Sequence, residues 1–536
     1  MTLAERLKAV ASEHPQRSAT VLPTGRRDRR GPAGYRRMTY AQLDRRCDAL
    51  AAGLTAAGVG PGVRTALLVP PGADFFALAF ALLRSGAVPV LIDPGIGARN
   101  LGTCLSEVAP QAFIGVPRAH AARLALGWCP GASIRISVGP ALPGVAASLR
   151  DVERRGRERL PFDPPPADPE ATAAVLFTSG STGVPKGVEY RHANFAAQSE
   201  LLRTLYGLGP DDVSLATFPP FALFGPPLGM TTVVPRMDPR HPARVDPRRI
   251  LEAANTFSAT FMFGSPALLD TVGRKAPAGA AMPTLRTVAS AGAPVPAAVQ
   301  RRFLQLLGPD AEICTPYGAT EALPVTSISS RDLLTASGRG VCVGRPVPGV
   351  DVALIRVTDD PLERLTADLL VPDGDVGEVV VRGPVVTESY VGRPTATAAA
   401  KLRWDGRVAH RMGDVAWRDA GGRLWFCGRK SERVPSAGRT LYPVPVESVF
   451  NEHPAVRRSA LVGAGSPPRP VICVELEDGV RASTALTRAL LARAAGDVDA
   501  AAVTAVLYHR GFPVDIRHNA KIDRPQLARW ATGRLR

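Results

Sequence analysis

Cysteine is sparse in this sequence and is not arranged for structural use. The 536 residues include seven cysteines, and the chain contains no Cys-x-x-Cys pair. Disulfide frameworks and zinc sites need cysteines in pairs or clusters, so this distribution argues against both. Isolated thiols fit a reducing compartment, and we therefore expect a cytoplasmic protein.

Long apolar runs are also missing. No stretch approaches about 18 uninterrupted apolar residues, the length that predicts a membrane-spanning helix. Residues Met1–Lys8 have the pattern of an amphipathic helix and lack the apolar centre of a signal peptide. Contact with a membrane is therefore expected to be peripheral at most.

Acidic residues are in the minority, with 48 against 65 basic residues and a net charge of +17. The basic excess is spread along the chain and gathers only in short clusters such as Arg26–Arg30. There is no basic stripe interleaved with aromatic residues and no motif that reads a nucleic-acid groove. We expect no nucleic-acid partner, although a basic surface could attract anionic substrates.

The residues that are present describe a globular chain of more than one domain. Hydrophobic residues make up 45% and charged residues 21%, which is ordinary for such proteins, and the length is too great for one small core. Helical and strand-like stretches alternate in the first part of the chain, which predicts an α/β fold with a parallel sheet covered on both faces. The stretches are a helix capped by Thr39 and running to Ala57, a strand at Arg64–Val69, a helix at Asp74–Ser85 and a strand at Val88–Ile92.

A connector at Pro161–Pro169 contains five prolines, and the alternation of helices and strands resumes after it.

The chain changes character after residue 341. Later stretches predict antiparallel strands at Val350–Ile355, Val376–Arg382 and Leu424–Cys427, which we expect to form a barrel-like subdomain. A charged and weakly structured stretch from Gly428 to Gly438 is the expected boundary between a large domain, residues 1–428, and a small α+β domain, residues 429–536.

The stretch Leu176–Val188 has the composition of a polyphosphate cradle. It follows an apolar strand at Ala173–Phe177 and contains three glycines, four hydroxyl residues and one lysine. Glycines let backbone N–H groups approach an anion, hydroxyls donate to the same oxygens, and the lysine adds positive charge. The usual nucleotide P-loop spacing is absent, and a flexible loop is the alternative. The candidate ligands are Thr178, Ser179, Gly180, Ser181, Thr182, Gly183 and Lys186.

Two further strands end in polar or tight turns. Thr287–Ser290 runs into Ala291–Pro294, and Ala311–Thr315 is followed by Pro316–Glu321. Ligands of open α/β sheets bind outside the carboxyl ends of the strands. There the ring of Tyr317 could stack on a nucleotide base, and the carboxylate of Glu321 could bind a Mg²⁺ ion that bridges phosphates.

Three other features are ambiguous by themselves. The apolar loop Phe218–Pro227 could line an acyl pocket or form a buried connector. Asp414 follows a glycine turn and could be an ordinary turn residue. Lys521 could be a solvated surface lysine.

Taken in order, these motifs resemble the adenylate-forming superfamily of acyl-CoA synthetases, peptide-synthetase adenylation domains and luciferases. The resemblance covers nearly the whole chain. Thr178–Gly187 matches the phosphate loop, and Ala291–Pro294 matches the adenine-binding turn. The remaining matches are Tyr317–Glu321, with Gly318 and Thr320, for adenine and Mg²⁺, Asp414 for ribose, Arg429 after it, and Lys521 as the C-terminal catalytic lysine. In the adenine-binding turn the matching positions are Gly292, Ala293 and Pro294.

The resemblance implies carboxylate activation with ATP and Mg²⁺. A carboxylate oxygen attacks the α-phosphate, which gives an acyl-adenylate and pyrophosphate. Lys521 is implied to bridge the carboxylate and the α-phosphate, and Glu321 to hold Mg²⁺. Thr178, Ser179, Thr182 and Lys186 are implied to hold the pyrophosphate. The small domain of this superfamily rotates between half-reactions.

The chain departs from the usual ligase pattern at two positions. Ala222 stands where a histidine or another bulky gate is common, and Ser431 stands at the domain hinge where Asp or Lys is common. Three other stretches are similar to one branch, the β-lactone synthetases of bacterial olefin and β-lactone biosynthesis. They are Leu91–Gly97, Phe218–Gly225 with Gly229 and Met230, and Thr315–Pro324.

That branch implies adenylation of a long-chain 2-alkyl-3-hydroxy fatty acid, followed by attack of the 3-hydroxyl on the activated carbonyl. Phe221, Ala222, Phe224 and Gly225 are the expected pocket residues, and other enzymes of the same lipid pathway are expected partners. His192 and His410 are candidates for the base, although a structural or surface role for each is favoured. The alternatives are a fatty acyl-CoA or acyl-AMP ligase and a silent acyl-adenylate binder.

Overall fold

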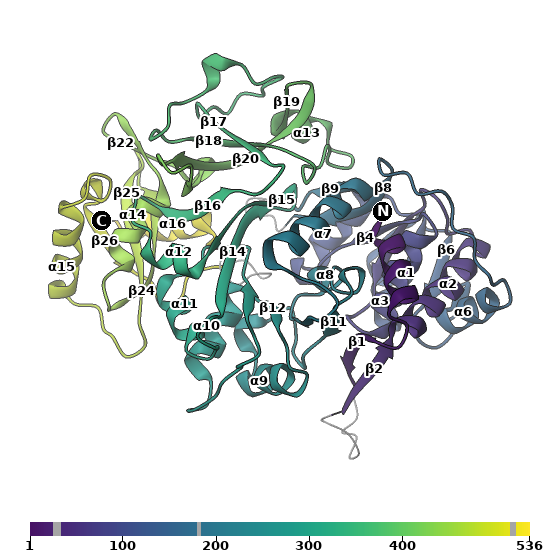
Figure 1. The fold of residues 1–536 in the computed structure, drawn as a ribbon. Coiled ribbons are helices and arrows are strands. Elements are labelled where there is room, and N and C mark those ends of the chain that lie inside the picture. Colours follow the sequence, from purple (N-terminus) through teal and green to yellow (C-terminus); the bar gives the residue numbers. More distant parts are fainter. Residues whose placement is uncertain (25–33, 179–183, 515–520, 536) are drawn as a thin grey trace. The chain divides into compact units, whose positions relative to one another are not determined.

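The computed structural model describes residues 1–24, 34–178, 184–514 and 521–535 (Figure 1). Its contacts divide the chain into two compact units. The first comprises Met1–Pro324 and Pro384–Thr397, and the second comprises Val325–Gly383 and Ala398–Arg536. The expected boundary of a mobile small domain at residue 429 falls within the second unit and stays a prediction.

The first unit contains a sheet that is parallel except at one edge. The strand order is β7-β6-β5-β3-β4-β8-β9, and only β9 runs antiparallel to its neighbour. The predicted parallel sheet is therefore confirmed. The strands are β3 (Arg64–Leu68), β4 (Val88–Leu91), β5 (Ala112–Gly115), β6 (Ile134–Ser137), β7 (Ala147–Ser148), β8 (Thr172–Phe177) and β9 (Gly187–Arg191).

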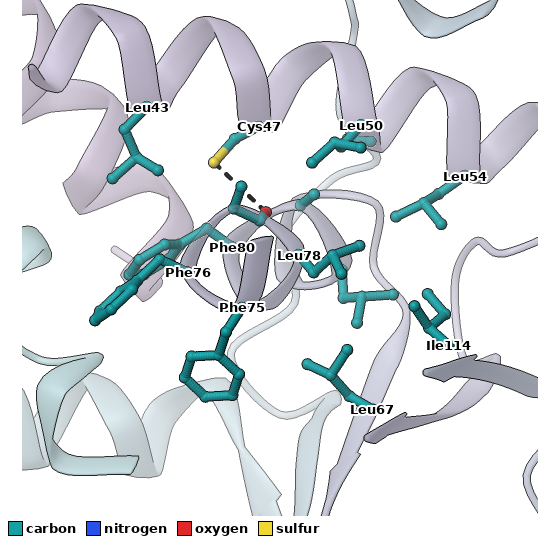
Figure 2. Packing of buried hydrophobic residues seen from close by; sticks show 14 of the residues in the cluster. Leu43, Cys47, Leu50, Leu54, Leu67, Phe75, Phe76, Leu78, Phe80 and Ile114 are labelled. Atoms are coloured by element: carbon teal, nitrogen blue, oxygen red, sulfur yellow. Dashed lines mark hydrogen bonds between the residues drawn. The ribbon is translucent and has the colours of Figure 1, made fainter. Parts of the chain in front are cut away.

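Two predicted helices build the core over this sheet. Helix α2 (Tyr40–Ala56) begins at Thr39, whose side chain accepts from the N–H of Gln42 in a capping box. Its apolar residues recur every three or four positions, so they share one face. Figure 2 shows that face, Leu43, Cys47, Leu50 and Leu54, packed against α3 (Ala73–Arg84), which contributes Phe75, Phe76, Leu78 and Phe80.

A second series of parallel strands in the first unit positions the candidate site. The order is β14-β13-β12-β10-β11-β1-β2, and the pairs from β1 to β14 are parallel. Their carboxyl ends therefore lie at one edge. The strands are β1 (Ser18–Pro23), β2 (Tyr35–Thr39), β10 (Val213–Ala216), β11 (Thr231–Val233), β12 (Phe261–Phe263), β13 (Thr287–Ala289) and β14 (Glu312–Ala319).

The second unit contains the predicted antiparallel strands. Their order is β17-β18-β20-β21-β16-β15, and in the described residues β17 does not pair back to β15, so the expected barrel-like part is a sheet that does not close on itself. The central strand β20 was not predicted, because its charged residues and Gly413 indicated a turn. The strands are β15 (Ala322–Ser329), β16 (Val341–Pro346), β17 (Asp351–Ile355), β18 (Gly377–Arg382), β20 (Arg407–Arg418) and β21 (Leu424–Arg429).

The stretch expected to be weakly structured, Gly428–Gly438, is ordered. The prediction was wrong because its charges are paired: Lys430 Nζ lies 3.1 Å from the buried Glu378, and Arg433 pairs with Asp359 at 2.6 Å. The segment forms a 3₁₀ turn and the hairpin β22 (Val434–Ser436) and β23 (Arg439–Leu441).

The C-terminal part of the second unit has the α+β character that was predicted. Strand β24 is antiparallel to β25, and β26 is parallel to β25. Among the helices of the described residues, none combines the length and apolar character needed to cross a bilayer. The elements are α14 (Pro443–Asn451), β24 (Val456–Ala464), β25 (Arg469–Leu476), α15 (Thr484–Ala495), β26 (Ala505–Tyr508) and α16 (Arg524–Thr532).

Candidate active site

The phosphate loop joins the antiparallel strands β8 and β9, and the structure describes its two ends. The N–H of Thr178 donates to Lys186 O at 3.0 Å, and the N–H of Lys186 donates to Thr178 Oγ1 at 3.1 Å. Thr178 thus closes the base of the loop, and its hydroxyl proton can still be donated to another acceptor. The candidate ligands Ser179, Gly180, Ser181, Thr182 and Gly183 lie outside the described residues.

The exit of the loop is held by Arg393. Its guanidinium donates to the carbonyls of Val184 and Pro185, each at 3.3 Å, and forms two hydrogen bonds to the carboxylate of Glu107 at 2.7 and 3.0 Å. A planar guanidinium suits such paired contacts because its donors are fixed in one plane. The path of the chain into Lys186 is therefore set by a segment about 200 positions away in the sequence.

The ammonium of Lys186 lies over an aromatic ring. Its Nζ is 4.8 Å from the centroid of Tyr390, which is buried. A ring face attracts a cation at this distance. The contact limits the positions that the flexible lysine side chain can take.

Glu321 lies at the turn between β14 and β15. Its carbonyl accepts from both the N–H and the hydroxyl of Thr387, at 2.9 and 3.0 Å. Its carboxylate accepts from the hydroxyl of Tyr390 at 2.6 Å. The turn needs a glycine at position 318, since a Cβ there would lie 2.5 Å from Ala322 O. Thr387 therefore holds the backbone of Glu321, and Tyr390 holds its carboxylate.

Glu321 is a single carboxylate, which fits a cation whose other ligands come from phosphate oxygens and water. Within the described part of the chain, no three His, Cys, Asp or Glu side chains gather as a metal cluster. Mg²⁺ is commonly bound through one or two carboxylates together with phosphate oxygens and water. With one Glu321 oxygen bonded to Tyr390, the other oxygen can serve as such a ligand.

The two strand-end motifs lie on neighbouring parallel strands. Ala289 of β13 is paired with Cys314 of β14, and the N–H of Ser290 continues the pairing to Cys314 O at 2.9 Å. The turn after β13 contains Gly292 with φ +97°, a conformation that favours glycine, followed by Ala293 and Pro294.

Strand β14 is longer than predicted. The expected strand ended at Thr315, whereas the observed one extends through Tyr317 and Gly318 to Ala319. Thr320 then forms the turn, where its carbonyl accepts from the hydroxyl of Tyr190. The motif residues are therefore presented by a strand end and a tight turn rather than by a loop.

The apolar loop after β10 divides its side chains between two clusters. Phe221 stacks on Phe263 with ring centroids 4.4 Å apart and contacts Phe224 at 5.9 Å. Ala222 instead is buried in the core cluster that contains Phe75. Gly225 packs so closely that a Cβ would lie 2.2 Å from Thr232 Oγ1.

Asp414 and Arg429 form a pair within the second unit. They lie directly opposite each other on β20 and β21, with Arg429 Nε 3.6 Å from Asp414 Oδ1. Asp414 was expected just after a glycine turn, whereas Gly413, with φ +65°, lies inside the strand. Asp414 is buried and Arg429 is half-buried.

Lys521 is half-buried and follows residues that lie outside the described part of the chain. Its neighbour Ile522 bridges to Val514, and Arg524 begins α16. Arg524 donates to the carboxylate of Glu447 and pairs with Glu432 at 2.9 Å. Arg524 also donates to Leu461 O on β24 at 3.0 Å, so the segment after Lys521 is fixed to α14 and to the small sheet formed by β24, β25 and β26.

The two candidate histidines have structural surroundings. His410 is buried in β20, and its Nδ1 lies 3.1 Å from Ala400 O. His192 begins α7 (His192–Tyr206), and burial lowers the pKa of its imidazole. Neither environment tests the role of a base, and the structural or surface role that the sequence favoured for each histidine stays a prediction.

Sequence reasoning missed Tyr390. It lies in the segment Glu388–Pro394, between strands, and none of the motifs identified in the sequence includes it. Its contacts to Lys186 and Glu321 cross 204 and 69 positions of sequence. Only the tertiary structure brings these three side chains together.

Comparison with known proteins agrees with this arrangement. Residues 7–391 match the family model described as AMP-binding enzyme. The chain is 48% identical to the olefin beta-lactone synthetase of Stenotrophomonas maltophilia, covering 99% of this chain and 98% of that protein. It is also 48% identical to the olefin beta-lactone synthetase of Xanthomonas campestris, covering 99% and 97%.

A solved structure shows the same fold. The anthranilate CoA ligase AuaEII, in complex with anthranoyl-AMP, superposes with a TM-score of 0.82 at 21% identity, covering 99% of this chain and 97% of that one. The family match and the two relatives of nearly equal length agree with the motif order. The chain belongs to the AMP-binding, adenylate-forming enzymes, in the branch that contains the olefin beta-lactone synthetases.

Proposed function

We propose that the protein is an ATP-dependent β-lactone synthetase that acts on a long-chain 2-alkyl-3-hydroxy fatty acid. The observation that carries this proposal is the 48% identity, over the whole chain, to two olefin beta-lactone synthetases. The alignments extend over 99% of the chain, so the proposal does not depend on a single motif.

In the first step a carboxylate oxygen of the substrate attacks the α-phosphorus of ATP, and pyrophosphate leaves. Charge develops on phosphate oxygens, so the step needs positioned cations and donors more than a base. Thr178, Ser179, Thr182 and Lys186 bind the β- and γ-phosphates. The close pairing of Thr178 with Lys186 supports this role, because it sets the width of the loop base.

Glu321 is the residue that would hold Mg²⁺, which supplies positive charge on the phosphate oxygens when bound. The turn after β13 and the ring of Tyr317 bind the adenine. Asp414 accepts hydrogen bonds from the ribose hydroxyls, and Arg429 orients that carboxylate. Lys521 donates to the reacting carboxylate and the α-phosphate. These roles follow from the motifs that each residue occupies.

In the second step the 3-hydroxyl oxygen of the same molecule attacks the activated carbonyl. A carbon–oxygen bond closes the four-membered ring, the bond to AMP breaks, and the hydroxyl proton is released. Both groups belong to one bound molecule, so the encounter costs no translational entropy and needs no thiol acceptor. Loss of AMP offsets the ring strain.

The aromatic rings of the apolar loop Phe218–Pro227 and of β12 are suited to binding an apolar substrate chain. Phe221, Phe224 and Phe263 form a contiguous set of rings next to the carboxyl ends of β10 and β12. Rings bury large apolar areas with few rotatable bonds, which suits a flexible alkyl chain. We place the acyl group along these rings and beside Ala222 and Gly225.

We also propose a cytoplasmic location, with other enzymes of the same lipid pathway as partners. All seven cysteines are free and buried, which fits a reducing compartment.

Product analysis tests the proposed function. The protein is incubated with ATP, Mg²⁺ and a synthetic 2-alkyl-3-hydroxy acid, with and without coenzyme A, and the products are identified by NMR. We expect a β-lactone, AMP and pyrophosphate in both incubations. A thioester that forms only with coenzyme A, without lactone, would instead identify an acyl-CoA ligase.

A further inference from the structure

Tyr390 contacts both charged residues of the nucleotide site described in the first unit. Its hydroxyl donates to Glu321 Oε1 at 2.6 Å, and its ring lies 4.8 Å from Lys186 Nζ. Only 5% of the residue is exposed. One side chain therefore contacts both the proposed magnesium ligand, Glu321, and the proposed pyrophosphate ligand, Lys186.

The backbone around Tyr390 is fixed against β9. Tyr390 forms a bridge with Val188, and the N–H of Val391 donates to Gly187 O at 2.8 Å. The N–H of Tyr390 donates to Thr397 Oγ1 at 3.1 Å. These contacts attach the backbone of Tyr390 to the strand that follows the phosphate loop, so the residue is anchored beside the base of the loop.

The hydrogen bond to Glu321 has a specific consequence for metal binding. A carboxylate on a flexible side chain loses rotamer freedom when it binds a cation. The phenol holds one oxygen in place and leaves the other available, so part of that cost is met before the cation binds. The ring also keeps the Lys186 ammonium close. A carboxylate partner would offset the positive charge of the ammonium, whereas the ring is neutral and leaves that charge available to the phosphates.

We propose, on the basis of the function proposed above, that Tyr390 is a positioning residue for the magnesium-nucleotide. It orients the Glu321 carboxylate through its hydroxyl and the Lys186 ammonium through its ring. These are separable effects, because phenylalanine keeps the ring and lacks the hydroxyl.

Binding of a non-hydrolysable ATP analogue tests the role without relying on turnover. Its affinity is measured by calorimetry across a range of Mg²⁺ concentrations for the wild type, Tyr390→Phe and Tyr390→Leu. For Tyr390→Phe we expect about a tenfold higher Mg²⁺ requirement, the effect of one hydrogen bond to a charged group, and unchanged affinity without Mg²⁺. For Tyr390→Leu we expect affinity without Mg²⁺ to fall as well.

Tyr40→Phe is the matched control. Tyr40 is a fully buried tyrosine of the same unit, and its hydroxyl donates to Pro226 O and Met230 O. Its removal should lower the melting temperature about as much as Tyr390→Phe does, with no change in the Mg²⁺ requirement. An unchanged Mg²⁺ requirement in Tyr390→Phe, or an equal change in Tyr40→Phe, would overturn the proposal.

A double-mutant cycle separates orientation of Glu321 from a general loss of packing. In the Glu321→Gln background, Tyr390→Phe should cause little further change in the Mg²⁺ requirement, because the carboxylate that it orients is gone. Fully additive effects would contradict the proposal. The binding assay uses no acyl substrate, so failure of lactone formation in the wild type would count against the proposed function alone.

Discussion

Lys521→Ala is expected to lower acyl-adenylate formation by about 10²–10³-fold, the loss typical of removing one donor to a developing negative charge. The lysine belongs to a C-terminal motif and is followed by residues fixed to the small sheet through Arg524. It carries the only charge assigned to the carboxylate and the α-phosphate at once. Its loss should therefore affect the first half-reaction rather than nucleotide binding.

Pyrophosphate exchange measures this effect. The rate of ATP–pyrophosphate exchange with the hydroxy acid is compared between the wild type, Lys521→Ala and Lys275→Ala. Lys275 is an exposed lysine at the end of α10 (Pro266–Lys275), and its removal should leave exchange near the wild-type rate. Unchanged exchange in Lys521→Ala would refute the catalytic role of this lysine.

Glu321→Gln is expected to lower adenylation by about 100-fold at physiological Mg²⁺. The substitution keeps the size of the side chain and an oxygen that can accept from Tyr390, so it removes charge with little change in packing. The backbone of the turn remains held by Thr387. The defect should therefore be one of metal and phosphate binding, and part of it should be recovered at high Mg²⁺.

The measurement is the exchange rate as a function of Mg²⁺ concentration, together with the melting temperature. Glu158→Gln, at an exposed position directly after α6 (Leu149–Arg157), serves as the charge-matched control. A Glu321→Gln protein with wild-type exchange at every Mg²⁺ concentration would exclude Glu321 as the metal ligand.

The periodic part of the fold could be predicted from the sequence. Helix α2 was predicted within one residue of each end, because the cap at Thr39 and the apolar spacing agree. Strand β20 was not predicted, since Arg411 and Asp414 suggest exposure. Both are in fact buried, with Arg411 paired to Glu378 at 2.7 Å and Asp414 beside Arg429. Pairing across strands is not visible in a local window.

The candidate site was predictable where a motif is contiguous. Thr178, Lys186 and Glu321 were found by the composition of their local motifs and Asp414 only by the family resemblance, and their assigned roles stay predictions. Tyr390 was not found, because its contribution depends on contacts with residues far away in the sequence.

The apolar loop Phe218–Pro227 shows a different limit of sequence-based prediction. Phe221 and Ala222 were both expected to line the pocket, but they lie in the short helix α8 (Pro219–Ala222). Neighbouring side chains on a helix point about 100° apart. Phe221 therefore joins the aromatic cluster while Ala222 is in the core. The pocket role of Ala222 stays a prediction.

Isotope labelling tests the central claim, that the enzyme activates the carboxylate and uses the substrate's own hydroxyl as the nucleophile. The substrate carries ¹⁸O at the 3-hydroxyl, and the lactone and AMP are analysed by mass spectrometry after one turnover. We predict that the label is retained in the lactone ring and that AMP contains none of it. Label in AMP would show that the hydroxyl had been activated and displaced, and would contradict the proposed mechanism.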